Sequence, residues 1–240
     1  MNTNFYVLPL DMTQTIRSFT QPFRTVFALA VTGVVLAAAW FGTSWVPFPK
    51  DGFIPSSLMT HSVMALGTLG FILWFGNRDF SAFGFTMGRW RFHWTILLWV
   101  LPTALPSTAA ALAGAVNDSP GPASGFSPLQ SILFIWIVAS TFEEFLTRGL
   151  LQTLLYKDWT AEPARHWFLS LPVILSGLFF GAMHLVLIPK MGAGVAPVIA
   201  MTTFLGWVTA RYRERFNSLV PAIIIHALFN IGGMLPGWLI

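Results

Sequence analysis

The sequence predicts an all-α fold, a polytopic membrane bundle of about seven to eight transmembrane helices, and three observations support this. Of the 240 residues, 55% are hydrophobic and only 9% are charged, whereas soluble domains average about 25% charged residues. The apolar residues form runs of about the 20 residues that a membrane-spanning helix needs. Lys and Arg are concentrated in alternate connecting segments, as expected for loops on one side of a membrane. A single membrane domain is therefore expected to occupy residues 1–240, without a sizeable soluble domain.

Seven apolar runs are candidate spans, and the first is Thr25–Val46. It is too long for the apolar part of a typical signal peptide, so it is expected to remain an uncleaved span. The remaining runs are Ser56–Phe75, Thr95–Val116, Leu129–Leu155, Trp167–Ile188, Ala193–Ala210 and Leu219–Ile240. Several contain Pro or Gly, which membrane helices tolerate, often as kinks. A short amphipathic stretch, Phe5–Leu10, is a candidate for one additional element.

The connecting segments predict the orientation of the chain. With Arg148 set aside because it lies inside the fourth run, alternate segments carry ten Lys and Arg on one side and two on the other. Cytoplasmic loops are rich in Lys and Arg, so the N-terminus is expected in the cytoplasm and the C-terminus outside. The basic segment 211–215 is then an anchor for anionic lipid headgroups, and no nucleic-acid partner is expected. The sequence has no cysteine, which excludes disulfides, thiolate metal sites and cysteine nucleophiles.

Six polar side chains stand out inside runs that should be apolar, and each charged one costs about 2.5–3.5 kcal/mol at mid-membrane. They are Glu143, Glu144 and Arg148 in the fourth run, His184 in the fifth, and His226 and Asn230 in the seventh. Glu144 and Arg148 are four residues apart, so they share a helix face and can pair. Glu143 then has no partner in its own helix, and a lone buried carboxylate is suited to exchanging protons. Alternatively, all three charges form a buried ion network that only holds helices together.

The histidines and the asparagine are suited to peptide-bond hydrolysis. His184 follows Phe180 by four residues, so the two rings share a face, and His226 and Asn230 have the same spacing. Hydrolysis needs a base that activates water and donors that stabilise the oxyanion. A glutamate with a histidine can supply the base, and a neutral histidine with an asparagine amide can supply the donors. Features of other intramembrane proteases are absent from the sequence: there is no GxSG or HExxH motif, and no Asp lies inside a predicted span.

At these positions the sequence resembles the type II CAAX prenyl endopeptidase family, also known as CAAX protease and bacteriocin-processing (CPBP) or abortive-infection proteins. The family motifs EExxxR, FxxxH and HxxxN are matched by the segments 143–148, 180–184 and 226–230, each in its own predicted helix. The resemblance covers residues 140–231, which are expected to form the core that carries the motifs.

The resemblance implies a role for each motif residue. Water activation falls to Glu143 and His184, the oxyanion hole to His226 and Asn230, and support of the site to Glu144, Arg148 and Phe180. The implied enzyme is a glutamate-type endopeptidase without a cofactor, acting near the C-terminus or the membrane-proximal part of a peptide or protein that carries a lipid group or none. Membrane lipid is the other expected partner, and the expected location is the inner membrane of a bacterial cell.

Three alternatives remain open at this point. A zinc peptidase could use His184, His226 and Glu143 as ligands. A non-catalytic membrane scaffold or a bacteriocin-immunity protein could retain the same motif residues. A transporter could use Glu143 as a proton relay, although the sequence shows no matching half-repeats.

The predicted bounds place the three motifs at different depths. Since a helix rises 1.5 Å per residue, Glu143 and His226 fall in the cytoplasmic half of the membrane and His184 falls nearer the outer face. One shared site requires the fifth helix to begin near Pro172, with Trp167–Leu171 along the interface. We then expect the site near mid-membrane, reached from the cytoplasm.

Overall fold

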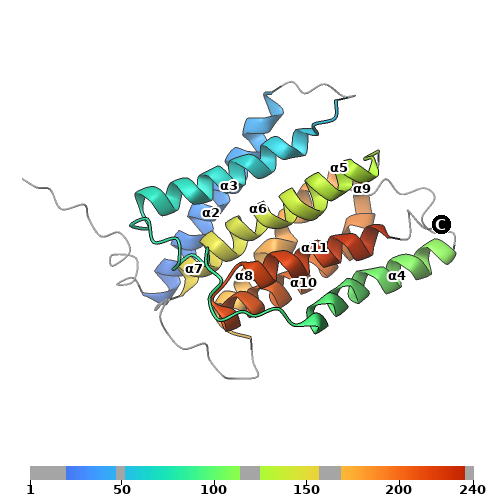
Figure 1. Ribbon diagram of the computed structural model, residues 1–240. Helices are drawn as coiled ribbons and strands as arrows, with labels where there is room; N and C mark the ends of the chain where they lie inside the picture. Colours follow the sequence, from blue (N-terminus) through green and yellow to red (C-terminus); the bar gives the residue numbers. More distant parts are fainter. Residues whose placement is uncertain (1–19, 47–51, 114–124, 157–168, 236–240) are drawn as a thin grey trace, which may run out of the picture.

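The structure, a computed structural model, describes residues 20–46, 52–113, 125–156 and 169–235, and every regular element in these ranges is a helix (Figure 1). Five helical stretches in this part of the chain are long and apolar enough to cross a membrane. A sixth apolar helix near the C-terminal end is shorter. The predicted fold class, a multi-pass helical membrane bundle, is confirmed.

The first two spans lie close to their predicted bounds. Helix α2 (Gln21–Ser44) begins before the predicted Thr25, with a proline in its first turn, where the missing N–H of that residue breaks no helical hydrogen bond. Helix α3 (Ser56–Trp74) begins directly after Pro55, as the apolar run indicated. The stretch Phe5–Leu10 lies outside the described residues.

The third span consists of two kinds of helix. It begins as the 3₁₀ helix η1 (Trp94–Val100) and continues as α4 (Leu101–Leu112), which has Pro106 in its interior. Because each proline lacks an N–H donor, Pro102 and Pro106 interrupt the regular hydrogen-bond ladder of this segment. The last residues of the predicted run, 114–116, lie outside the described residues.

The fourth span is a continuous helical run that changes its winding around the two adjacent glutamates. Ser127 caps its start, and its side chain and that of Gln130 bond each other's backbone N–H groups as a capping box. The run comprises α5 (Pro128–Gln130), η2 (Ser131–Ala139), α6 (Ser140–Glu144), η3 (Phe145–Leu151) and α7 (Gln152–Leu155), of which η2 and η3 are π-helical. Such wider turns are rare and often occur at functional sites. The glutamates therefore lie on a short α-helical segment between two wider ones.

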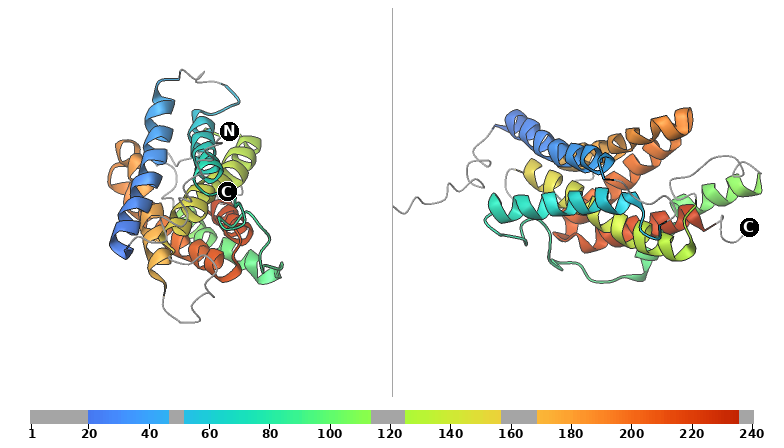
Figure 2. Two further views of the ribbon diagram at one scale, coloured as in Figure 1. Left: turned by 90° about the vertical axis from the view of Figure 1, so that its left-hand side faces the viewer. Right: turned by 90° about the horizontal axis from the view of Figure 1, so that it is seen from above.

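The next stretch, Leu171–Phe216, folds back on itself as a hairpin of two long helices. It comprises α8 (Leu171–Met183), η4 (His184–Leu187), α9 (Ile188–Met191), η5 (Gly192–Gly194) and α10 (Val195–Phe216). Helices α8 and α10 pack against each other along their length, and Figure 2 shows them side by side. Ser170 caps α8, with Pro172 in the first turn, so the helix begins where a single shared site required it.

The structure corrects the sixth predicted span. Helix α10 does not end at Ala210 but continues to Phe216, so the basic segment 211–215 is helical. Arg and Glu are good helix formers, and the helix stops only at Asn217, whose φ of 51° is left-handed. The last helix, α11 (Val220–Met234), follows at once.

Glycines bring α8 and α10 unusually close together. A Cβ added at Gly206 would lie 2.7 Å from the Cα of Gly177, a distance that real Cβ atoms do not adopt. One added at Gly181 would collide with the Thr203 hydroxyl. This close approach fixes the position of α8, which carries Phe180 of the FxxxH motif.

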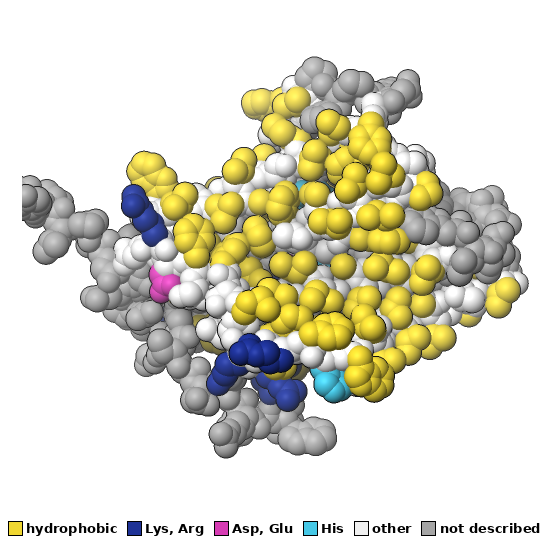
Figure 3. Space-filling model, viewed as in Figure 1, with side chains coloured by type: hydrophobic (Ala, Val, Ile, Leu, Met, Phe, Trp, Pro, Cys, Tyr) yellow, Lys and Arg dark blue, Asp and Glu magenta, His cyan; other side chains and the backbone are white. Residues whose placement is uncertain are grey.

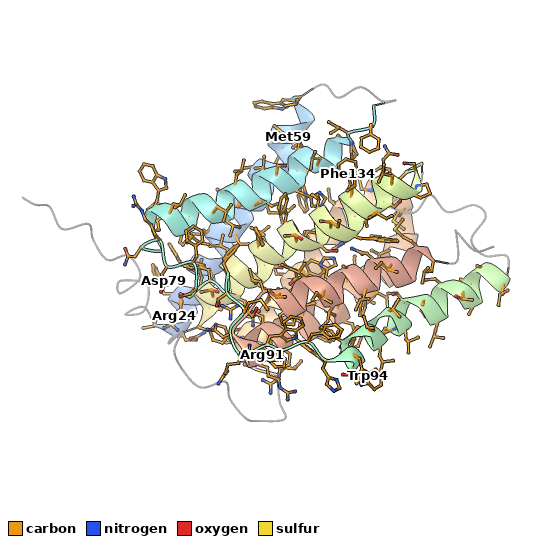
Figure 4. All side chains as sticks on the ribbon, in the orientation of Figure 1. Arg24, Met59, Asp79, Arg91, Trp94 and Phe134 are labelled. Atoms are coloured by element: carbon orange, nitrogen blue, oxygen red, sulfur yellow. The ribbon has the colours of Figure 1, made fainter. Side chains whose placement is uncertain are left out.

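The outer surface matches a lipid environment. Figure 3 shows one face largely covered by hydrophobic side chains, with charged side chains gathered near one end. In Figure 4, Arg24, Asp79 and Arg91 lie near that end, whereas Met59 and Phe134 lie toward the other. Large apolar side chains such as Val34, Leu66 and Ile137 are more than half exposed, as expected for residues that face lipid.

Candidate active site

The candidate site lies around α6. Helix α6 packs against α3 on one side and α11 on the other, as Figure 1 shows, and α8 packs against the following η3. The motif residues therefore come from separate helices that meet here. They are Glu143 and Glu144 on α6, Arg148 on η3, Phe180 on α8, His184 at the start of η4, and His226 and Asn230 on α11.

The predicted pairing of Glu144 with Arg148 is present. Their Oε2 and Nε atoms lie 3.2 Å apart, and both side chains are fully buried. The two atoms are not aligned as a hydrogen bond, so the attraction between their charges holds this contact. The other oxygen of Glu144, Oε1, lies 3.0 Å from His226 Nδ1. Glu144 thus joins the first motif to the third.

Arg148 also contacts the second motif. Its Nη2 donates to the carbonyl oxygen of Gly206 at 2.9 Å, and its Nη1 donates to the Thr147 hydroxyl. Its guanidinium carbon lies 4.5 Å from the centre of the Phe180 ring, within the range of a cation–π contact. A buried arginine therefore fixes both the carboxylate of Glu144 and the ring of Phe180.

Phe180 lies between the two motif histidines. Its ring centre is 5.2 Å from that of His184 and 5.3 Å from that of His226, with the rings nearly perpendicular in both cases. Such edge-to-face pairs are favourable contacts for aromatic rings. The fully buried phenylalanine thus connects the FxxxH and HxxxN motifs in space.

Glu143 has partners from two other helices. Its Oε1 lies 3.0 Å from His61 Nε2 on α3, and its Oε2 lies 3.8 Å from His226 Nε2 on α11. The second distance is too long for a hydrogen bond. The side chain is 12% exposed, unlike that of Glu144. Of the two adjacent glutamates, only Glu143 is therefore partly exposed.

His61 was not among the candidates taken from the sequence. A signal was present, since an ionisable residue inside an apolar span is by default a functional candidate. However, His61 belongs to no motif, and its partner is 82 residues away in the sequence. No local spacing could have paired it with Glu143.

The hydrogen bonds of the motif histidines indicate which ring nitrogen donates. His184 Nδ1 lies 2.8 Å from the carbonyl oxygen of Phe180, which can only accept, so Nδ1 carries the proton. His226 Nδ1 lies 3.0 Å from a carboxylate oxygen of Glu144, which acts as an acceptor, so here too Nδ1 donates. In the neutral rings, Nε2 is then an acceptor. With Nδ1 as the donor to Glu144, donation by His226 through Nε2 requires a second ring proton.

Asn230 lies one turn away along α11 and is bonded to the fourth span. Its Nδ2 donates to the Ser140 hydroxyl at 3.0 Å and to the Ile135 carbonyl oxygen at 3.4 Å. The structure therefore brings Glu143, Glu144, Arg148, Phe180 and the two motif histidines together, with Asn230 at the edge of the group. The longer of its two bonds is the one that a substrate oxygen could replace.

The proposed zinc ligands do not form a metal site in the part of the chain that the structure describes. Within these ranges, no group of three or more His, Cys, Asp and Glu side chains is placed to hold a metal ion. We therefore derive no step through zinc.

The buried ion pair, the two histidines and the accessible glutamate, within a multi-pass helical bundle, match an intramembrane protease. The family model described as type II CAAX prenyl endopeptidase Rce1-like matches residues 125–232, a segment that contains all three motifs. The match supports the family that the motifs indicated for this part of the chain. A search of the curated proteins found no match, and a search of the solved structures found none.

Proposed function

We propose that this membrane protease cleaves a peptide bond near the C-terminus, or in a membrane-proximal part, of a peptide or protein substrate, with water activated by Glu143 and His184. The observation that carries the proposal is the environment of Glu143. This side chain is partly exposed, one of its oxygens bonds to His61, and it lies beside the buried Glu144–Arg148 pair. A second glutamate held as an ion pair supports the site, while the first remains available for proton transfer.

The first chemical step is attack by water on the scissile carbonyl carbon. Glu143 Oε2 accepts one proton from the water, and His184 orients the water through its acceptor atom Nε2. The water oxygen forms a bond to the carbonyl carbon while the carbonyl π electrons move to its oxygen. When this tetrahedral intermediate collapses, the C–N bond breaks, and the proton held by Glu143 passes to the departing amine. The products are one carboxylic acid, which keeps the second proton of the water, and one amine.

The oxyanion of the intermediate is stabilised by His226 and Asn230. Protonated His226 donates through Nε2, and the carboxylate of Glu144 at 3.0 Å from Nδ1 stabilises that positive charge. Asn230 donates through its amide after giving up the bond to the Ile135 carbonyl. Removal of one such donor typically costs about 100–1000-fold in rate.

A prenylated C-terminal peptide is the first substrate to test, because the matched family model is described as a CAAX prenyl endopeptidase. We propose that the substrate reaches the site from the cytoplasmic side. In the proposed orientation the N-terminus lies in the cytoplasm, because Lys and Arg are concentrated in alternate connecting segments. The proposed location in a bacterial cell is the inner membrane.

The test is cleavage of prenylated and plain peptide libraries by purified protein in detergent. Wild type is compared with Glu143→Gln and with Asp79→Asn, the same carboxylate-to-amide change at an exposed position outside the site. We expect cleavage by wild type and by Asp79→Asn, none by Glu143→Gln, and no effect of a chelator. Loss of cleavage with chelator, restored by Zn²⁺, would replace this mechanism with a zinc one. A phenotype in cells that Glu143→Gln leaves unchanged would favour a non-catalytic scaffold or immunity protein.

A further inference from the structure

The His61 imidazole is held at both nitrogens. Its Nδ1 lies 2.7 Å from the carbonyl oxygen of Ser57, one turn earlier on α3, and its Nε2 lies 3.0 Å from Glu143 Oε1 on α6. The side chain is 14% exposed, close to the 12% of Glu143. His61 lies outside residues 125–232 and outside all three motifs.

The two contacts determine where the protons lie. A carbonyl oxygen can only accept, so Nδ1 of His61 carries a hydrogen and donates it to Ser57. Nε2 has no hydrogen in the neutral ring, yet it lies within hydrogen-bond distance of a carboxylate oxygen. One proton must therefore lie between Nε2 and Oε1, supplied by either a protonated ring or a protonated carboxyl group.

This bond selects which oxygen of Glu143 can react. Oε1 is occupied by His61, whereas Oε2 lies 3.8 Å from His226 Nε2, beyond hydrogen-bond distance. A glutamate side chain has three rotatable bonds, and within its own helix Glu143 has no side-chain partner among the described contacts. The hydrogen bond from His61 thus orients the carboxylate of Glu143.

We propose that His61 is a positioning residue that holds Glu143 through Oε1, so that Oε2 faces the reacting water. The inference rests on the proposed function, because it assigns His61 a part in that same step. Groups that assist proton transfer must be held close to the productive geometry, and a displacement of about 1 Å can cost about 100-fold in rate. Helix α3, which lies outside the family match, would then contribute to catalysis.

The chain offers a matched set of variants. In His61→Gln, the side-chain amide nitrogen can occupy the place of Nε2 and still donate to Glu143. In His61→Asn, the shorter amide can reach Ser57 but not Glu143, and His61→Ala removes both contacts. His93 is an exposed histidine at the start of η1, so His93→Ala is the control for loss of a histidine outside the site.

The readouts are kcat and KM on the best substrate of the library, together with the thermal unfolding midpoint of each variant. We expect His61→Ala and His61→Asn to lower kcat about 10–100-fold with little change in KM, and His61→Gln to recover most of the loss. His93→Ala should keep the wild-type kcat and KM, while its unfolding midpoint should fall slightly because the side chain accepts a hydrogen bond from the Thr95 N–H. A rise in KM alone would overturn the inference. So would kcat losses that track the unfolding midpoints of the variants and do not distinguish His61→Gln from His61→Asn.

A second measurement tests the contact without turnover. The infrared band of the Glu143 carboxyl group is assigned by its disappearance in Glu143→Gln. We expect it to shift in His61→Ala and to stay in place in His93→Ala. No shift in His61→Ala would overturn the inference, whether or not peptides are cleaved. Activity in Glu143→Gln would instead reject the proposed function.

Discussion

The guanidinium carbon of Arg148 lies 4.5 Å from the centre of the Phe180 ring, so the arginine of the first motif is stacked on the phenylalanine of the second. Phe180 in turn contacts both motif histidines by its ring, while Glu144 contacts Arg148 and His226. The three motifs are thus physically one cluster. Substitutions of residues in this cluster should show which of them stabilise the fold and which affect kcat.

The first prediction concerns the buried ion pair. Arg148→Met leaves the fully buried carboxylate of Glu144 without its cation, which typically costs about 3–5 kcal/mol in the free energy of unfolding. The double variant Glu144→Gln/Arg148→Met should recover part of that loss, because the uncompensated charge is gone. Denaturant unfolding in detergent measures both, with the exposed Arg91→Met as a control that should stay within about 0.5 kcal/mol of wild type. Equal stability of Arg148→Met and Arg91→Met would contradict the importance of the pair.

The second prediction concerns the ring between the histidines. Phe180→Leu keeps an apolar side chain but removes the edge-to-face contacts with His184 and His226. We expect a lower kcat with a stability loss below about 1.5 kcal/mol, since apolar exchanges of similar volume are usually tolerated. Phe134→Leu, a comparable change at a buried residue of η2, should leave kcat unchanged. Equal kcat values for the two variants would show that the ring does not position the histidines.

The sequence predicts contacts between residues that are close along the chain better than contacts between residues that are far apart in it. The Glu144–Arg148 pair follows from helical spacing alone, and the apolar runs place the start of α3 and the end of α7 correctly. The C-terminal end of α10 was missed. The apolar run ends at Ala210, whereas the helix continues to Phe216 through polar residues that favour helix formation.

The long-range part of the site could not be predicted in the same way. The contact between His61 and Glu143 depends on how α3 packs on α6, and no periodicity in either segment encodes it. The proton on Nδ1 of His226 likewise depends on a glutamate from another helix. Motif matching found the residues of the cluster but not the hydrogen bonds that set their donor and acceptor atoms.

The third prediction separates catalysis from packing at Asn230. Its amide donates to the Ser140 hydroxyl at 3.0 Å. If this bond were the whole role of Asn230, Ser140→Ala would lower kcat as much as Asn230→Ala. If Asn230 stabilises the oxyanion, Asn230→Ala should lower kcat by about 100–1000-fold, while Ser140→Ala retains the amide and most of the rate. Steady-state kinetics of the two variants decide the matter. Similar losses in both would assign Asn230 to holding α11 against the fourth span.

The fourth prediction concerns pH and Tyr156, which follows α7 outside the fourth span. Its hydroxyl donates to Glu214 Oε1 at 3.1 Å. Burial, followed by the negative charge of Glu214, raises the pKa of Tyr156 above its ordinary value. The unfolded chain therefore releases this proton first as pH rises past about 10.

The unfolding midpoint should consequently be insensitive to this group below about pH 10 and fall above it. In Tyr156→Phe, the decline attributable to this group should disappear, although the midpoint at neutral pH drops because the bonds to Glu214 and Gln152 are lost. Thermal unfolding between pH 8 and pH 11, approximately the range around the ordinary tyrosine pKa, provides the comparison. Parallel curves for the two proteins would contradict the prediction.

The last prediction tests the close approach of α8 and α10. In Gly206→Ala, the new Cβ would lie 2.7 Å from the Cα of Gly177, so the two backbones must separate. Overpacking of this kind costs about 1–3 kcal/mol. Gly206 also offers its carbonyl oxygen to Arg148, so the separation should disturb the site and lower kcat as well.

Gly149→Ala is the matched control for this change. Its added Cβ would meet the Leu219 and Phe85 side chains at 3.6 Å, an ordinary contact distance, and alanine favours helix over glycine by about 1 kcal/mol. We therefore expect Gly149→Ala to be neutral or stabilising in denaturant unfolding, with full activity, and Gly206→Ala to lose both stability and rate. If Gly206→Ala behaves like Gly149→Ala, α8 does not pack closely enough on α10 for the hairpin to fix Phe180 against Arg148.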